Sequence, residues 1–233
     1  MQLNFRLSYY SITTFLKCPK KFEYIYSIKP DKVLKQARAK EADWGVRVHE
    51  AIAQYYSWLL HAKDDIDDSL REAKIIDFFE QKRDPARGSE YDEFITTCCN
   101  NFIKYELKKR PKTAKIEAIE VECRNEYLTG RLDLVLSDRV IDWKTGKPMS
   151  FFDESLIVQG SIYLLLTGLP KVDFVFLRTG KVLTLTSPNT KLIQHVVDEI
   201  ESKTEFEKRV SPLCRFCEYQ LWCQFSDKVL WQL

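Results

Sequence analysis

The 233-residue sequence contains few glycines and prolines, 7 and 8 respectively, which excludes collagen-like and low-complexity chains. It also lacks long hydrophobic runs. The longest candidate, residues 157–166, is interrupted by Gln159 and Gly160 and is too short to cross a bilayer. The N-terminal residues lack the basic-then-apolar pattern of a secretion signal. We therefore expect a soluble, cytoplasmic protein with no membrane partner, and 45% hydrophobic residues are enough to form one large domain.

Neither sign of charge dominates, because 36 Lys and Arg balance 34 Asp and Glu and the formal net charge is +2. The positive charge is nevertheless unevenly distributed. Residues 17–40 contain eight Lys or Arg against two acids, and residues 103–115 contain six against one. Such stretches can mark a surface that follows a phosphate backbone, although most are solvated helix faces. The charge pattern alone leaves a nucleic-acid surface open.

Seven cysteines form an odd set, and without a secretion signal they argue against a disulfide framework. Three of them, Cys98, Cys99 and Cys123, lie among apolar neighbours, and we interpret them as core thiols. The other four are one N-terminal residue and a C-terminal C-x2-C-x5-C array: Cys18, Cys214, Cys217 and Cys223. Four thiolates can hold either zinc or an iron–sulfur cluster.

Hydrophobic periodicity predicts a helical first half and a mixed strand-and-helix second half. Ser8 or Ser11 could cap a short helix that ends at Cys18-Pro19. Further helices are predicted over residues 43–61, 66–82, 89–109, 154–166 and 190–208, and strands over 116–123, 130–136, 139–144, 172–178 and 181–187. We expect a single domain with a mainly helical part (about 1–115), an α/β core (about 116–208) and a cysteine-containing tail (about 209–233).

The most informative stretch is GRLDLVLSDRVIDWKTGK, residues 130–147. If Ser137-Asp138 forms a two-residue turn, Asp133 lies directly opposite Asp142 in an antiparallel hairpin, with Cβ atoms roughly 4.5–5.5 Å apart. Lys144 shares that face, because side chains alternate along a strand. Facing carboxylates destabilise a hairpin unless a divalent cation and an ammonium lie beside them, and oxygen ligands suit Mg²⁺ or Mn²⁺. The alternative is a solvent-facing strand pair with surface ion pairs.

Asp133 followed by Asp142-Trp143-Lys144-Thr145-Gly146 resembles the signature of PD-(D/E)xK nucleases, specifically the RecB-type branch. His49 on an upstream helix and the Q-x-x-x-Y pair Gln159 and Tyr163 occur in the same order as in that branch. The opening SYYSITTFLKCPKKFEYIY is also similar. The resemblance covers most of the chain and implies a restriction-endonuclease-like α/β core, a central mixed sheet flanked by helices, with a helical N-terminal region.

This resemblance implies that Asp133, Asp142 and Lys144 are catalytic and that His49 joins the two aspartates as a ligand of Mg²⁺ or Mn²⁺. The backbone carbonyl of Trp143 is a further candidate ligand. An imidazole ligand favours Mn²⁺ more than an all-oxygen site does. Without the resemblance, His49 would be interpreted as a core histidine, because it lies on an apolar helical stripe.

Gln159 and Tyr163 are four residues apart and share one helix face. The resemblance implies that they lie near the lysine and contact nucleic acid, whereas the alternative is a polar helix surface. Glu120 lies on the strand before the hairpin, and we interpret it as a surface residue rather than as an outer ligand.

The four separated cysteines resemble the iron–sulfur staple of AddB-like nucleases and of CRISPR-associated prespacer-processing nucleases. The resemblance implies a [4Fe–4S] cluster held by Cys18, Cys214, Cys217 and Cys223, which would join the two ends of the chain. A zinc site is the alternative, although Cys₄ zinc sites are usually built from two C-x2-C pairs and only one pair is present here.

The implied function is a metal-dependent deoxyribonuclease, foremost an exonuclease on single-stranded DNA with endonuclease activity as a further option, in recombination, repair or CRISPR spacer acquisition. The chain has no G-x-x-x-x-G-K-[ST] loop, so unwinding would need a helicase or other DNA-processing partner, or pre-existing single strands. The rival interpretation is a non-catalytic DNA-binding or assembly subunit. It is disfavoured because His49, both aspartates and Lys144 are all present. A zinc-stapled RNA-binding module is a third interpretation.

Overall fold

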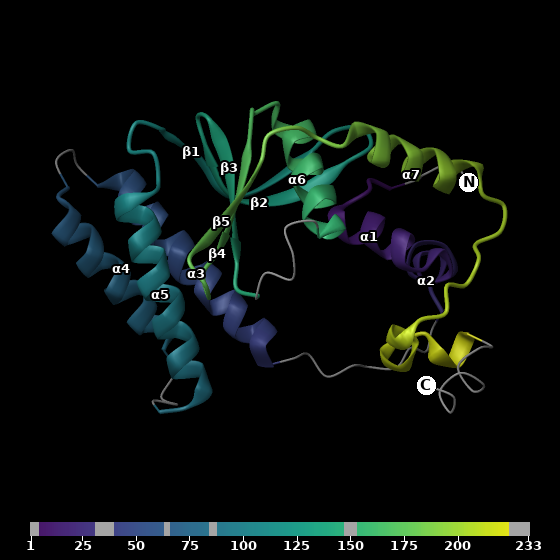
Figure 1. Ribbon diagram of the computed structural model, residues 1–233, viewed down its shortest axis with the longest axis horizontal. Helices are drawn as coiled ribbons and strands as arrows, with labels where there is room; N and C mark the ends of the chain where they lie inside the picture. Colours follow the sequence, from purple (N-terminus) through teal and green to yellow (C-terminus); the bar gives the residue numbers. More distant parts are fainter. Residues whose placement is uncertain (1–4, 31–39, 63–65, 84–87, 147–152, 224–233) are drawn as a thin grey trace.

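The computed structural model describes residues 5–30, 40–62, 66–83, 88–146 and 153–223. In these residues a five-stranded mixed sheet lies between two layers of helices (Figure 1). The predicted α/β class with a helical N-terminal region is confirmed. No helix of the described residues is long and apolar enough to span a membrane.

The sheet has the strand order β1-β2-β3-β4-β5. The strands are β1 Ile116–Arg124, β2 Thr129–Leu136, β3 Arg139–Lys144, β4 Val172–Phe176 and β5 Lys181–Leu185. The first three form an antiparallel meander, β4 runs parallel to β3, and β5 is antiparallel to β4. A parallel pair needs a crossover connection, and helix α6 (Glu154–Thr167) lies in that connection.

One face of the sheet is covered by α3 (Lys40–His61), α4 (Asp68–Lys82) and α5 (Glu90–Lys108), on the left of Figure 1. We call the cluster buried between these helices and the sheet the α3-side core. Its members include Val48, Tyr55, Tyr56, Phe102, Leu134, Ile141 and Trp143. The helix boundaries agree with the periodicity to within about three residues, as expected where tertiary packing selects an amphipathic face.

The opposite face is covered by α1 (Tyr9–Lys17), α2 (Pro19–Glu23), α6 and α7 (Thr190–Ser202). We call the cluster buried there the α6-side core, which includes Phe15, Leu132, Val140, Val158, Ile162 and Phe174. Ser8 is the cap of α1, since its side chain accepts a hydrogen bond from the backbone N–H of Ser11. As predicted, that helix ends before Cys18-Pro19, and Pro19 begins α2.

The last helix is shorter than predicted. The periodicity continues to residue 208, but α7 ends at Ser202 and Lys203 is extended. Phe206 is buried instead against Phe15 and Phe22, with ring centroids 6.2 and 6.0 Å apart. This contact turns the chain toward α2, and two single-turn helices follow, Pro212–Phe216 and Gln220–Trp222. The cysteine-containing segment therefore lies beside the N-terminal helices, at the lower right of Figure 1.

Candidate metal centre

The hairpin of β2 and β3 has the register that the sequence predicts. Leu136 pairs with Arg139 and Leu134 with Ile141 across the turn. The pairing of the two strands ends there, and the predicted facing of the two aspartates is wrong, because Asp133 contacts His49 of α3 and Asp142 contacts Gln159 of α6. On β3, alternation sends Ile141 into the α3-side core and places Asp142 and Lys144 toward α6.

The alternation of side chains breaks at Glu120 and Asp133. Glu120 has a φ of 49°, which is unusual for a residue other than glycine. Residues two apart in a regular strand share a face, yet Ile119 packs on the α3-side core and Val121 on the α6-side core. On β2, Leu134 likewise packs on the α3-side core and Leu132 on the α6-side core. The break turns Glu120 and Asp133 toward His49 of α3.

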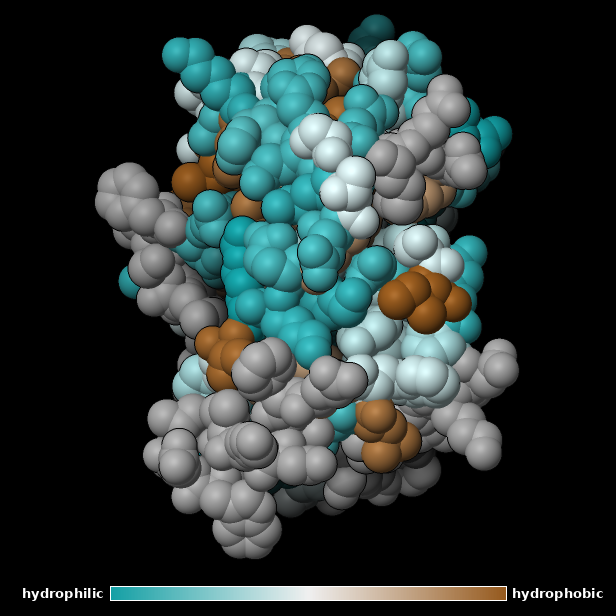
Figure 2. All heavy atoms as spheres, turned by 90° about the vertical axis from the view of Figure 1, so that its right-hand side faces the viewer, coloured by the Kyte–Doolittle hydropathy of each residue, from teal (hydrophilic) through white to brown (hydrophobic). Residues whose placement is uncertain are grey.

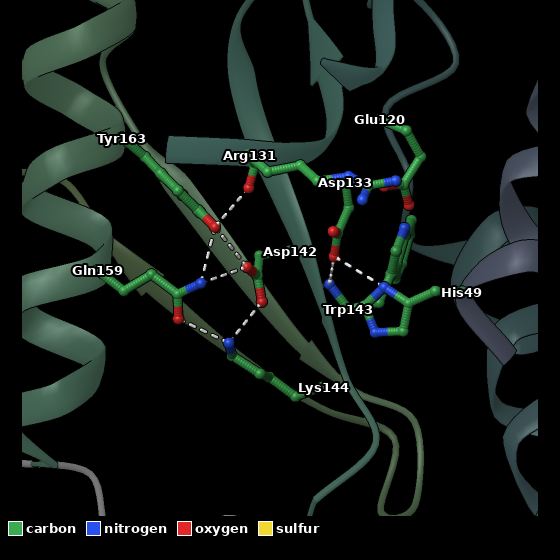
Figure 3. A network of polar contacts seen from close by, with 9 residues as sticks. All are labelled: His49, Glu120, Arg131, Asp133, Asp142, Trp143, Lys144, Gln159 and Tyr163. Atoms are coloured by element: carbon green, nitrogen blue, oxygen red, sulfur yellow. Dashed lines mark hydrogen bonds and ion pairs between the residues drawn. The ribbon is translucent and has the colours of Figure 1, made fainter. Parts of the chain in front are cut away.

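His49, Glu120 and Asp133 form a potential metal-binding group, since one ligand atom from each lies within 4.8 Å of the other two. Asp133 Oδ2 is 3.4 Å from His49 Nδ1 and accepts a hydrogen bond of 2.8 Å from the backbone N–H of Trp143 (Figure 3). Glu120 Oε2 accepts a hydrogen bond of 2.9 Å from Nε of Arg131. The group lines an open groove of about 580 Å³.

A second group surrounds Asp142, which is 3% exposed. Its Oδ1 accepts hydrogen bonds from Gln159 Nε2 at 2.8 Å and Tyr163 Oη at 3.1 Å. Its Oδ2 is buried and forms an ion pair of 2.8 Å with the Lys144 ammonium. Lys144 also donates to Gln159 Oε1 at 2.6 Å. In Figure 3 the Asp142 carboxylate points toward Lys144 and Gln159, and that of Asp133 points toward His49.

The electrostatics of both groups favour a bound cation. Burial, assisted by the charge of Asp133, raises the pKa of Glu120, with Arg131 and His49 opposing. Burial also raises the pKa of Asp142, against the effect of Lys144. Burial alone would lower the pKa of His49, but its contact with Asp133 and the nearby carboxylates raise it. Glu120 and Asp133 are two neighbouring carboxylates beside one imidazole and one exposed guanidinium, and a divalent ion would add positive charge there.

Trp143 connects the candidate metal centre to the α3-side core through aromatic packing. Its ring stacks on Tyr56, with centroids 6.0 Å apart and planes at 16°, and Phe102 and Tyr105 contact it edge-on. Tyr56 in turn donates a hydrogen bond of 2.7 Å to the fully buried Glu106. The residue between Asp142 and Lys144 is therefore held by the helical layer.

The structure brings together some of the predicted site residues but not all. His49 meets Asp133, and Asp142 meets Lys144, whereas Asp142 is outside the 4.8 Å group. Gln159 and Tyr163 are 7% and 4% exposed and bind Asp142 rather than forming an open surface. Their contact with nucleic acid stays a prediction, as does the role of the Trp143 carbonyl.

Glu120 is the residue that sequence reasoning undervalued, because a strand residue at positive φ cannot be recognised by alternation. The available signal was its place on the strand beside Asp133, two residues after Ala118 in an alternating segment.

Some residues of the two basic stretches form intramolecular ion pairs. In the described part of 17–40, Lys20 forms an ion pair with Glu23, and Lys21 with Glu218 at 3.0 Å. Residues 31–39 lie outside the described residues. In 103–115, Arg110 binds Glu106. Figure 2 shows the side of the molecule formed by the N-terminal helices and the C-terminal segment. Its central area is mainly hydrophilic, and hydrophobic side chains appear as separate spots around it.

The four separated cysteines line one cavity. Cys18 from the N-terminal helices and the three C-terminal cysteines surround a small cavity of about 50 Å³. Tyr24 closes one side, and its hydroxyl donates 2.7 Å to the carbonyl of Trp222. The backbone N–H of Ser211 donates to Sγ of Cys214 at 3.4 Å. The core-thiol interpretation fits Cys98 and Cys99, which are buried, but less well Cys123, which is partly exposed.

Comparison with known proteins identifies a family over nearly the whole chain. A model of the PD-(D/E)XK nuclease superfamily matches residues 6–224. No curated protein sequence matches significantly. Among similar solved structures is one described as the crystal structure of SSO0001, with 14% sequence identity, coverage of 82% of this chain and 98% of that chain, and a TM-score of 0.35. Similarity at this TM-score does not bear on the function of the chain.

Proposed function

The chain belongs to the PD-(D/E)XK nuclease superfamily, and from this premise we propose that it is a metal-dependent deoxyribonuclease that hydrolyses phosphodiester bonds, foremost as an exonuclease on single-stranded DNA. Superfamily membership indicates a nuclease, and DNA as the substrate is our proposal. The observation that carries it is the placement of the Asp142–Lys144 pair beside the His49–Asp133 pair, next to an open groove. The biological setting we propose is recombination, repair or spacer acquisition.

The donor set fits a divalent cation. His49 and Asp133 supply two ligands, and the buried carboxylate of Asp142, whose described cationic partner is Lys144, supplies a third. We assign these three side chains, with the Trp143 carbonyl, as the residues that would hold Mn²⁺ or Mg²⁺. Bound there, the cation would polarise the phosphate and lower the pKa of a water.

Lys144 would act on the reacting phosphate. Its ammonium is fixed by Asp142 and Gln159 and lies 5.4 Å from the ring centroid of Phe174. A positioned cationic donor of this kind offsets negative charge that grows on the phosphoryl oxygens and orients the attacking water. Gln159 contributes by holding both members of the pair at once, through Oε1 and Nε2.

Activity is tested with single-stranded DNA labelled separately at each end and incubated with Mn²⁺, Mg²⁺ or EDTA. We expect degradation with either metal, faster with Mn²⁺, and none with EDTA, because the ligand set requires a cation. The two labels report the polarity of digestion, and a circular single strand separates exonuclease from endonuclease action. Tight DNA binding without cleavage under any metal would instead support the assembly-subunit interpretation.

We further propose that Cys18, Cys214, Cys217 and Cys223 hold a [4Fe–4S] cluster. The four residues line one cavity although Cys18 is nearly two hundred residues from the others in sequence. The sequence favours this group over zinc, because Cys₄ zinc sites are usually built from two C-x2-C pairs and only one such pair is present. Such a group would structurally join α1 and α2 to the C-terminal segment.

Metal content tests this assignment. Anaerobically purified protein is expected to be brown, with a broad visible absorption band and iron and acid-labile sulfide near four per chain. Cys18→Ser should lose the colour, because one ligand is removed. The control Cys123→Ser should keep it, since Cys123 does not line the cavity. Zinc without iron or sulfide would contradict the cluster assignment.

A further inference from the structure

Glu120 contributes a third ligand atom to the group that contains His49 and Asp133. Its side chain is 22% exposed and opens onto the same groove as theirs. An oxygen ligand here would join an imidazole and a carboxylate, a donor set that suits Mn²⁺. The group therefore includes Glu120, although regular alternation along β1 would turn its side chain elsewhere.

The conformation and the partial burial of Glu120 are energetically unfavourable, and the contacts of the described residues offset this cost only weakly. Its φ of 49° is unfavourable for any residue with a Cβ atom. Its carboxylate is partly buried beside Asp133, a second carboxylate. Its ion-pair partner among the contacts of the described residues is Arg131, whose side chain is 72% exposed. Exposed pairs of this kind stabilise a protein only weakly, so a purely structural role does not account for the arrangement.

The contacts of Arg131 allow its guanidinium to move away from the Glu120 carboxylate. Its backbone carbonyl accepts a hydrogen bond of 2.8 Å from Tyr163 Oη, which also binds Asp142. The main chain is thus fixed to the Asp142 group while the guanidinium extends into the groove. The Glu120–Arg131 contact can open without moving the strands.

We propose that Glu120 is an additional ligand of the divalent cation, and that Arg131 holds its carboxylate in place until the cation displaces the guanidinium. This inference rests on the proposed nuclease function and deepens it. It makes Arg131 and the cation competitors for one carboxylate. The competition can be measured by metal binding, without reference to catalysis.

The test is titration of the full-length protein with Mn²⁺, followed by electron paramagnetic resonance of the free ion. Glu120→Gln is expected to weaken Mn²⁺ binding at least about tenfold, the lower range for loss of a residue that only orients a ligand. Glu122→Gln is the matched control, because it removes the same charge from an exposed position two residues along β1. It should change the dissociation constant less than about twofold.

Arg131→Met separates competition from a general effect of charge. Both predict tighter Mn²⁺ binding in this variant. Only competition for Glu120 predicts that the gain disappears when Arg131→Met is added to Glu120→Gln, which a double-mutant cycle measures. An equal gain in both backgrounds would remove the displacement step.

Glu120→Gly provides a check on folding. Glycine accepts the positive φ, so the variant should keep or raise the thermal midpoint while it loses Mn²⁺ affinity. If Glu120→Gln binds Mn²⁺ within threefold of the wild type while Asp133→Asn loses binding, the inference is overturned and the proposed metal site stands. If Asp133→Asn also binds like the wild type, the proposed site itself falls.

Discussion

Replacing Lys144 by alanine is expected to reduce the turnover of single-stranded DNA by about 100- to 1000-fold, the range seen when one preorganised donor to a developing oxyanion is removed. The wild-type ammonium is held by two oxygens, 2.6 Å from Gln159 and 2.8 Å from Asp142. It therefore needs no reorganisation when charge grows on the phosphate. The loss should fall on kcat rather than on DNA binding, because the groove and the proposed ligands remain.

Binding measurements distinguish this effect from unfolding. Lys144→Ala should bind Mn²⁺ and labelled single-stranded DNA about as well as the wild type, and its circular dichroism spectrum should be unchanged. Lys144→Met, which keeps the aliphatic stem beside Phe174, should be as inactive as the alanine variant. Lys181→Ala is the control, since Lys181 is an exposed lysine of β5. Turnover within tenfold of the wild type in Lys144→Ala would contradict the proposed role.

The hairpin could be predicted from the sequence because its geometry is local. A two-residue turn at Ser137-Asp138 fixes the register next to it, and the structure pairs Leu136 with Arg139 accordingly. The same reasoning failed to place Glu120, because its positive φ reverses the alternation on β1. This backbone conformation accompanies the packing of nearby residues of β1 and β2 on opposite faces of the sheet. A short stretch of sequence does not reveal such tertiary packing.

The burial of Gln159 and Tyr163 could not be predicted from the sequence either. A Q-x-x-x-Y pair indicates one helix face, but burial depends on what covers the helix. Here α6 packs between the sheet and helices α1 and α7, so the pair is enclosed and its polar atoms bind Asp142. The end of α7 depends likewise on a distant partner, the contact of Phe206 with Phe22.

The helical layer is coupled to the metal centre through one buried carboxylate. Glu106 is 0% exposed and accepts hydrogen bonds from Tyr55 at 3.0 Å, Tyr56 at 2.7 Å and Arg110 at 2.7 Å. Burial and the charge of Glu106 raise the pKa of both tyrosines, which keeps them protonated as donors. Since Tyr56 stacks on Trp143, Glu106 supports the strand that carries Asp142 and Lys144.

Glu106→Gln is therefore expected to lower the free energy of unfolding by about 3–5 kcal/mol, the cost of removing one partner of a buried ion pair. The substitution keeps the shape of the side chain but leaves the buried Arg110 guanidinium without a counter-charge. Urea denaturation followed by circular dichroism measures the change, and Glu117→Gln, an exposed site on β1, should shift it by less than about 0.5 kcal/mol. At a temperature where the variant is still folded, nuclease activity and Mn²⁺ affinity should both fall, because Trp143 loses its support and both its carbonyl and the neighbouring Asp142 are proposed ligands. A wild-type denaturation midpoint in Glu106→Gln would contradict the stabilising role of Glu106, and the support of Trp143 would then depend on aromatic packing alone.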